Sequence, residues 1–176
     1  SHNKEKIKEL ASGAQKDEAN SWFVGKAFQV FYDDKKIGIW QLNEADEAAK
    51  NGQLPGDIKI LDADGNGEIT TDDRVVSSKR PKVTFGLNNS FSVYDFDFSF
   101  FIYSRLGQWI DYEYNRGYKP DGLENSANVD YWTPENPTNA FPRPNRFNSF
   151  AKTRYSSTLK YEKGSFVKIR DITLAY

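Results

Sequence analysis

The chain has no cysteine and a single histidine, His2, among its 176 residues. The lack of cysteine excludes disulfide scaffolds, thiol catalysis and zinc sites built on thiolates. One histidine at the start of the chain excludes a Ser-His-Asp triad and any metal centre that needs several histidines. Glycine-rich phosphate loops are also missing. We therefore expect a protein that is not an enzyme.

Neither sign of charge dominates, and long apolar runs are absent. The 24 basic and 25 acidic residues give a formal net charge of -1, so no basic excess indicates a nucleic-acid partner. No run approaches the roughly 18 apolar residues of a membrane helix, and no apolar stretch behind Ser1 indicates a signal peptide. We expect a soluble chain, one that crosses a membrane as strands, or one whose export signal lies outside this segment.

Aromatic residues are abundant in an otherwise polar chain. The mean hydropathy is -0.76, yet 15% of the residues are aromatic, with 13 Phe, 10 Tyr and 4 Trp. Disordered chains are poor in aromatic residues. The composition favours extended surfaces that face apolar surroundings or stack on ligands.

Residues 83–93 and 96–104 alternate between apolar and polar side chains, which is typical of strands with two different faces. The residues that share the apolar face are Val83, Phe85, Leu87, Phe91, Val93, Phe96, Phe98, Phe100 and Ile102. Only Tyr94-Asp95 separates the two segments, which predicts a β-hairpin. Strands of about 10 residues can cross a bilayer when tilted, apolar towards lipid and polar towards the lumen. A half-buried pair in a soluble antiparallel sheet has the same pattern.

Weaker patterns predict further elements. We expect a strand over 22–32, a short apolar segment over 37–41, and a helix over 43–50 that Asn43 caps and Asn51-Gly52 ends. Regular structure is expected again near 158–161 and over 165–176, with a bulge near Arg170-Asp171 where the apolar parity switches. The chain stops at Tyr176 within this last strand, which predicts a segment cut from a longer protein. Residues 106–155 are expected to be irregular, and loops of that length are usually functional or disordered.

Residues 62–73 match an EF-hand-type calcium loop, which needs hard oxygen ligands at fixed positions. The predicted ligands are the side chains of Asp62, Asp64 and Asn66, the backbone carbonyl of Glu68, and the carboxylate of Asp73. Gly67 occupies the sharp turn, Ile69 the apolar anchor, and Thr70 a position that binds directly or through water. Asp73 replaces a longer glutamate, so we expect looser closure. An acidic turn without metal is the alternative. No second loop is present, which favours a structural ion over a paired sensor.

The long segment 106–155 also contains candidates for ligand contact. Two carboxylates can hydrolyse glycosides, and the loop acids are Asp111, Glu113, Glu124 and Asp130. Nothing places two of them at the required spacing, so solvated loop acids are the simpler interpretation. The aromatic candidates for stacking on a sugar are Trp109, Tyr131 and Trp132, with Tyr112, Tyr114, Tyr118 and Phe141 as further members. They can equally cover the loop's own core or a barrel interface.

Several segments, in order, resemble one family. They are Trp22-Phe23-Val24-Gly25, Ile37-Gly38-Ile39-Trp40-Gln41, Pro55-Gly56-Asp57-Ile58-Lys59, the loop 62–73 with Arg74, the run 131–139 (YWTPENPTN) and the run 164–174 (GSFVKIRDITL). Together they closely resemble the C-terminal half of the barrel in SusC/RagA-type TonB-linked outer-membrane transporters of Bacteroidota. The resemblance covers nearly the whole chain and is weakest in residues 1–20 and 106–128.

The resemblance implies an all-β fold class: a segment of a transmembrane antiparallel β-barrel with long extracellular loops, a short helix and the EF-hand-like calcium loop. Such barrels have short periplasmic turns and long external loops. Residues 1–176 then divide into an extracellular loop with the calcium motif (33–82), a transmembrane hairpin (83–104), a long extracellular loop (105–157) and barrel strands (158–176). The Tyr94-Asp95 turn is periplasmic.

The implied function is part of a TonB-dependent transporter in the cell outer membrane that imports glycans, peptides or other nutrients. The implied partners are a SusD-like surface lipoprotein that acts as a lid, the TonB complex acting through a plug, and outer-membrane lipid; calcium is the cofactor. The plug, the TonB box, a signal peptide and the closing strands are not in this segment, so we expect no transport by it alone. The alternative is a soluble calcium-binding β module with a carbohydrate-binding role, whose compact core would bury the apolar face of the hairpin.

Overall fold

A computed structural model describes residues 1–122, 126–147 and 153–176. The chain forms two compact units, each assembled from separate stretches. Unit 1 contains Ser1–Phe31, Val76–Ile110 and Lys163–Tyr176, and unit 2 contains Tyr32–Val75 and Asp111–Glu162. Within the described ranges, no helix has both the length and the hydropathy that crossing a bilayer would require.

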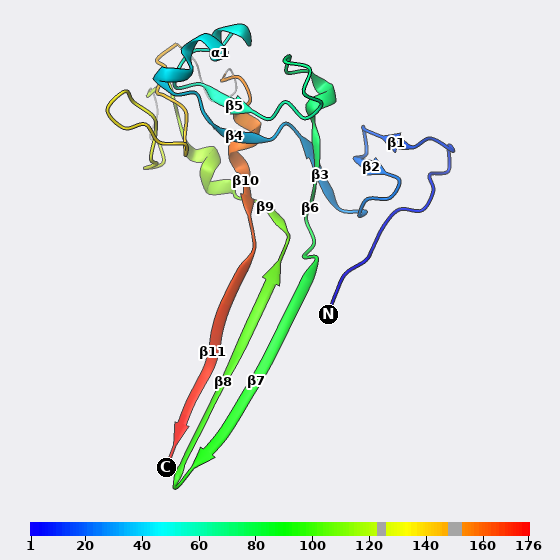
Figure 1. The fold of residues 1–176 in the computed structure, drawn as a ribbon, viewed down its shortest axis with the longest axis vertical. Helices are drawn as coiled ribbons and strands as arrows, with labels where there is room; N and C mark the ends of the chain where they lie inside the picture. Colours follow the sequence, from blue (N-terminus) through cyan, green and yellow to red (C-terminus); the bar gives the residue numbers. More distant parts are fainter. Residues whose placement is uncertain (123–125, 148–152) are drawn as a thin grey trace. The chain divides into compact units, whose positions relative to one another are not determined.

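The main element of unit 1 is a three-stranded antiparallel sheet in the order β11-β8-β7 (Figure 1). Its strands are β7 (Val83–Val93), β8 (Phe96–Leu106) and β11 (Phe166–Ala175). The two-residue turn Tyr94-Asp95 joins β7 to β8, with Tyr94 at φ 54°. The paired strands confirm the predicted hairpin. It forms because the alternating aromatic and β-branched residues suit a pleated sheet with two different faces.

The register brings most apolar residues of the three strands to one side of this sheet, while Phe101, Tyr103 and Phe166 lie on the other. Leu87 and Ile169 both pair with Ile102, while Phe91 and Leu174 both pair with Phe98. Ile169 and Leu174 have opposite parity in the sequence, and a register shift between Arg170 and Thr173 brings them to the same face. The predicted bulge is therefore confirmed, with Asp171 at φ 52°. We call this side of the sheet the apolar face.

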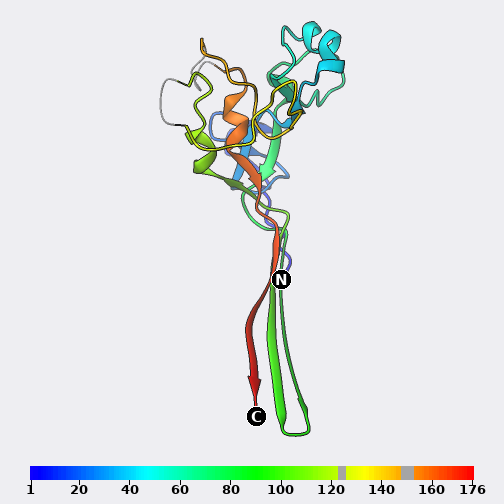
Figure 2. The ribbon, with the colours of Figure 1, turned by 90° about the vertical axis from the view of Figure 1, so that its left-hand side faces the viewer.

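The apolar face is open to solvent in unit 1. Phe85 is 47% exposed, Phe91 50% and Leu174 68%. Figure 2 shows the three strands edge-on, and no other described segment of unit 1 lies over the sheet between the N-terminus and the β7–β8 turn. A compact module with this hairpin in its core would require the opposite, so the described part of unit 1 does not have that arrangement.

The remainder of unit 1 is held by short pairings. Strands β1 (Lys16–Asp17) and β2 (Trp22–Phe23) pair with each other, and His2 bridges to Val83 at the start of β7. The single strand predicted over 22–32 is wrong. A turn interrupts it, in which Gly25 has φ 82° and the Lys26 N–H donates to the Phe23 carbonyl at 3.0 Å, and strand structure resumes at β3 (Val30–Asp33).

Unit 2 is built around the antiparallel pair β4 (Lys36–Ile39) and β5 (Ile58–Ile60). Its hydrophobic core consists of Ile39, Ile58, Ile60, Tyr118, Trp132 and Leu159. Further short elements of unit 2 are the 3-10 helices η2 (Thr71–Asp73), η3 (Glu113–Gly117) and η5 (Ser156–Lys160). The boundaries between the two units along the chain fall within four short strands, which form the pairs β3 with β6 (Val75–Ser78) and β9 (Trp109–Asp111) with β10 (Tyr161–Lys163). The predicted long irregular segment thus contains only short elements in its described part.

The predicted helix is real but begins differently. A 3-10 turn, η1 (Leu42–Glu44), precedes α1 (Ala45–Lys50). Asn43 lies inside this turn and is not the cap; Gln41 is the cap residue, and its backbone N–H donates to the Glu44 carboxylate at 3.0 Å. The predicted end is confirmed, since the Asn51 N–H bonds back to Ala48 and Gly52 has φ 64°.

Candidate functional site

The loop after β5 folds around the side chain of Asp62. Its two carboxylate oxygens accept the backbone N–H groups of Gly65 at 2.7 Å and Gly67 at 2.8 Å. Both glycines have positive φ, 74° and 87°, a conformation that costs glycine little because it has no Cβ. The loop therefore has the sharp turn that the calcium motif needs at Gly67.

Asp73 closes the loop from its other end. Its side chain is fully buried, and its two oxygens accept the N–H groups of Ala63 and Thr70, both at 2.7 Å. The bond from Thr70 is the main cause that lowers the pKa of the Asp73 carboxyl, followed among the favourable causes by the bond from Ala63. A buried carboxylate held in this way is ionised at neutral pH and joins two ends of the loop.

Three of the five predicted ligands come together. Carboxylate oxygens of Asp62, Asp64 and Asp73 all lie within 4.8 Å of one another. Asn66 is next to them: its amide N–H donates to Asp64 at 2.9 Å and its side-chain oxygen accepts the Glu68 N–H at 2.7 Å. Hard oxygen donors at this density suit calcium, and three like charges so close repel one another unless a cation or N–H donors compensate.

The rest of the motif connects the loop to the protein. Ile69 packs against the hydrophobic core of unit 2, as expected of the apolar anchor. The Thr70 hydroxyl accepts the Asp72 N–H at 3.2 Å and caps η2. The donor set is thus held between the core and a capped helical turn, and it fits a calcium ion.

The aromatic candidates are placed differently from one another. Trp132 is only 4% exposed and belongs to the core of unit 2, where its indole N–H donates to the Gln41 side chain at 2.9 Å. Its ring is therefore not available for stacking on a ligand. Tyr131 is 42% exposed, and Trp109 in β9 of unit 1 is partly buried. Among the three, Tyr131 presents the most open ring.

The run 130–139 is a hydrogen-bonded turn that attaches to β4. Asp130 accepts bonds from the Asn136 amide at 2.8 Å and from the Thr138 hydroxyl. The Asn139 side-chain oxygen accepts the Ile39 N–H at 2.9 Å. This arrangement gives the polar residues of the run a structural role. The sequence had indicated the run through the family resemblance and through Asp130, Tyr131 and Trp132 as candidates for ligand contact.

Acid should loosen this turn. The bonds from Thr138 and then Asn136 lower the pKa of the Asp130 carboxyl. A carboxyl whose pKa is depressed in the folded state stabilises that state at pH values above its ordinary pKa of 3.8. This stabilisation is lost as the pH falls through the folded-state pKa. Carboxyl-resolved NMR titration should show Asp130 titrating below 3.8 together with the Thr138 amide; in Asn136→Ala the midpoint should rise. A midpoint unchanged by that substitution would contradict the assigned bond.

Replacing the buried indole should affect folding and leave ligand contact alone. Trp132→Phe keeps most of the apolar volume but leaves the Gln41 oxygen without its donor, which should cost about 1–2 kcal/mol of unfolding free energy. Urea unfolding measures this effect, and Tyr131→Phe on the exposed neighbour is the control, expected within about 0.5 kcal/mol of the parent. Equal stability of the two variants would place the Trp132 ring outside the core.

Three of the four loop acids are bound to nearby donors. Asp111 and Glu113 both bind Arg116, at 3.0 and 3.3 Å. Asp130 is engaged in its turn, and Glu124 lies outside the described residues. The arrangement satisfies these carboxylates with nearby donors.

Comparison with known proteins identifies the class. No protein-family model matches the chain. TonB-dependent receptor P26 of Formosa agariphila is 33% identical over 162 residues, which cover 87% of this chain and 16% of that receptor. TonB-dependent receptor P3 of the same organism is 30% identical over 158 residues, covering 86% of this chain and 15% of the receptor. The chain spans about a sixth of the length of these curated relatives.

A solved structure shows the fold. The structure of the RagAB peptide transporter matches 98% of this chain and 19% of its own, with a TM-score of 0.59 and 18% sequence identity. The chain has the fold of a β-strand segment from a transporter of this kind, and its sheet is not closed into a barrel within the described residues. It is a homologue of the TonB-dependent receptors over 86–87% of its length. None of these proteins is named as an enzyme, which agrees with the expectation from the sequence.

Proposed function

We propose that the chain is a wall segment of a TonB-dependent transporter in the outer membrane. The observation that carries this proposal is the exposed apolar face of β7, β8 and β11. A strand of 11 residues is about 36 Å long at about 3.3 Å per residue. Tilted by about 45°, it rises about 25 Å, the height of the apolar band in outer-membrane barrels. Acyl chains are the surroundings that suit such a face.

The edges of the sheet support the same proposal. The order β11-β8-β7 leaves the outer edges of β7 and β11 without a strand partner among the described residues, apart from the short bridge at His2. Unpaired backbone groups are costly in lipid, so a membrane-spanning sheet needs strands on both sides. We infer that other strands of a barrel supply these bonds.

The aromatic end of the sheet fits a membrane interface. Tyr94 in the turn is 96% exposed and Tyr176 is 93% exposed, and the Tyr176 ring lies 5.1 Å from that of Phe96. Aromatic girdles mark both interfaces of outer-membrane barrels. On this topology the β7–β8 turn faces the periplasm, and residues 33–82 and 105–157 lie outside the cell.

Imported nutrients and partners follow from the class. RagAB is named as a peptide transporter, and the exposed Tyr131 offers a ring that can stack on a sugar or contact a peptide. We propose import of glycans or peptides with a SusD-like lipoprotein at the surface and energy from the TonB complex. Glycans are our first choice of substrate because aromatic residues are so frequent in the loops.

We also propose that the loop 62–73 holds a structural calcium ion outside the cell. Asp62, Asp64, Asn66 and Asp73 are its side-chain ligands, and Glu68 contributes its carbonyl. The proximity of the three carboxylates and the fit of hard oxygen donors support this assignment. The ion would neutralise the cluster and stiffen a loop that has little core of its own.

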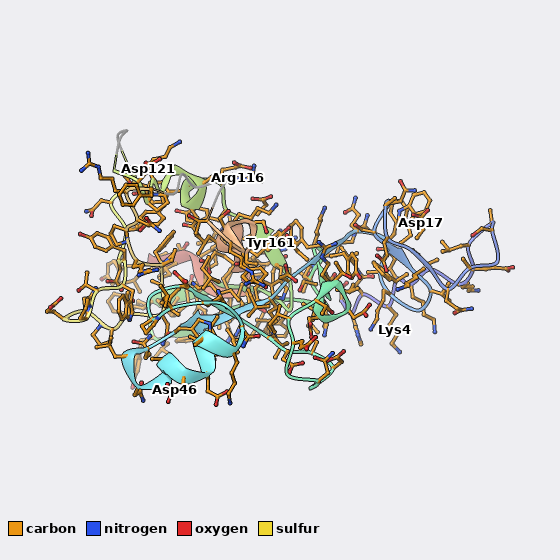
Figure 3. The ribbon with its side chains drawn as sticks, turned by 90° about the horizontal axis from the view of Figure 1, so that it is seen from above. Lys4, Asp17, Asp46, Arg116, Asp121 and Tyr161 are labelled. Carbon is orange, nitrogen blue, oxygen red and sulfur yellow. The ribbon has the colours of Figure 1, made fainter. Side chains whose placement is uncertain are left out.

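Site-specific labelling tests the topology, because this segment has no native cysteine. Single cysteines at Leu87, on the apolar face, at Tyr94, in the turn, and at Asp46, on the exposed side of α1 (Figure 3), report on three environments. In intact cells a membrane-impermeant maleimide should label Asp46→Cys alone. Tyr94→Cys should react only after the outer membrane is permeabilised, and Leu87→Cys only with a lipid-soluble probe. Labelling of all three by the aqueous reagent without detergent would overturn the proposal.

A further inference from the structure

Charge is distributed unevenly along the three-stranded sheet. Between Val83 and Ser104 the only charged residues are Asp95 and Asp97, at the turn end. At the opposite end Lys79, Arg80 and Lys82 lead directly into β7. One end of the hairpin is therefore acidic and aromatic, and the other is basic.

The start of the chain adds more positive charge at the basic end. His2 bridges to Val83, and the Asn3 N–H donates to the Lys82 carbonyl at 2.9 Å. This pairing places Lys4 directly after the residues that meet the start of β7, and Lys6 and Lys8 follow in the segment that bridges to Val24 through Ile7 (Lys4 is labelled in Figure 3). Glu5 and Glu9 are the acids of the same segment, and Glu5 is bound to Arg80 at 2.8 Å.

Several of these cations are available for an external ligand. Lys4, Lys79 and Lys82 are exposed and form no ion pair within the described part of the chain. The carbon stem of Lys82 covers Gly107, and the Lys79 ammonium lies 4.5 Å from the centre of the Phe31 ring. The stem of Lys82 rests on the backbone of Gly107 and leaves its ammonium free to reach a polar layer, whereas the Lys79 ammonium makes an exposed cation–π contact that is weak enough to exchange for an anionic ligand.

We propose that Lys4, Lys6, Lys8, Lys79 and Lys82, which we call the basic rim, bind the phosphate groups of anionic lipid headgroups at the outer surface of the membrane. This inference rests on the proposed function, which places the sheet in the bilayer with the β7–β8 turn in the periplasm. The apolar face ends at the paired residues Val83 and Leu106, and the headgroup layer begins where acyl chains end. The basic rim follows this boundary directly in the chain.

Electrostatics explains why anionic headgroups bind at the basic rim and not at the turn end of the hairpin. A basic residue near an anionic membrane surface raises affinity about fivefold, and the effect disappears within a Debye length of about 8–10 Å. The turn end, with Asp95 and Asp97, repels the same headgroups. Phosphate-bearing lipid in the outer leaflet would therefore fix both the depth and the orientation of this hairpin.

The test measures lipid preference in the whole membrane-inserted protein. The protein is reconstituted into nanodiscs of phosphatidylcholine that contain either phosphatidylglycerol or bis-phosphorylated lipid A as probe, and retained lipid is counted by native mass spectrometry. The triple variant Lys4→Gln, Lys79→Gln, Lys82→Gln should retain the anionic probes with at least about tenfold lower affinity. The control Lys16→Gln, Lys35→Gln, Lys50→Gln removes the same charge elsewhere and should match the parent.

Salt and soluble phosphate complete the test without relying on a variant. Raising the salt concentration should remove the preference of the parent protein, whereas millimolar inorganic phosphate should not compete, because the proposed ligand is a lipid. Equal retention by the parent, the rim variant and the control would overturn the basic rim while leaving the proposed function intact. Failure of the parent to enter any bilayer, including pure phosphatidylcholine, would instead overturn the proposed function. The single variant Lys4→Gln should show a smaller loss in the same direction.

Discussion

Phe100→Arg should prevent stable insertion of the three-stranded sheet into a membrane. Phe100 is next to the central residue of β8, lies on the apolar face opposite Asn89 of β7, and its ring lies 5.7 Å from that of Phe98. A cationic side chain on the lipid face near the bilayer midplane costs about 2–4 kcal/mol. Loss of the aromatic contact with Phe98 adds about 0.5–1.5 kcal/mol. Together these losses approach the stability of many proteins.

Ser99→Arg is the matched control for this prediction. Ser99 is the preceding residue of β8, pairs with Ser90 and Thr173, and points to the other side of the sheet. On a water-filled lumen an arginine is tolerated, so Ser99→Arg should insert nearly as well as the parent. The measurement is urea-induced unfolding from lipid vesicles, together with the amount of protein in the outer-membrane fraction. Similar losses in both variants would show that the two faces have the same surroundings, and the barrel assignment would then be wrong.

The hairpin and bulge could be predicted because their signals are local. Alternation with period two defines both faces of a strand, and Asp171 at the parity switch has the positive φ that a bulge can require. The start of α1 was predicted wrongly for an equally local reason. Asn43 is a good cap residue by type, but Glu44 folds back to the Gln41 backbone and begins the turn two residues earlier. Two competing caps cannot be ranked from side-chain type alone.

The core of unit 2 depends on contacts that no local pattern reveals. Trp132 joins Ile39 and Ile58 across long separations in sequence. An aromatic residue in a polar run looks like a candidate for ligand contact, and only its burial shows that it packs inside. The proximity of Asp62 and Asp73, in contrast, could be predicted from a local pattern, because the turn residues of the short loop between them bring the two carboxylates together. Short-range chemistry was therefore easier to predict than the packing of the loops around it.

Asp64→Asn should weaken calcium binding strongly with little change in the calcium-free fold. Asp64 is exposed, and within the described part of the chain its carboxylate accepts hydrogen bonds only from the backbone and side-chain N–H groups of Asn66. Asparagine keeps an oxygen for the backbone bond but removes one of three clustered charges. We expect at least about a tenfold loss in affinity, or about 1.4 kcal/mol, from a starting dissociation constant of about 0.1–1 mM typical of extracellular calcium modules. Asp72→Asn removes a charge outside the cluster and should bind as the parent does.

Asp73→Asn should lose both calcium and stability, which separates the two roles of this residue. Its carboxylate accepts two backbone N–H bonds inside the protein. An amide can accept only one of them and turns its own N–H towards the other, which should cost about 1–3 kcal/mol even without metal.

At calcium about a hundredfold above its dissociation constant, the parent should gain about 2.7 kcal/mol on binding, and neither ligand variant should show this gain at the same concentration. Calorimetric titration and thermal unfolding with calcium or with chelator measure both quantities. A parent protein whose unfolding is the same in calcium and in chelator would contradict the calcium site, while the intrinsic loss in Asp73→Asn would remain, because it arises from the hydrogen bonds of the loop.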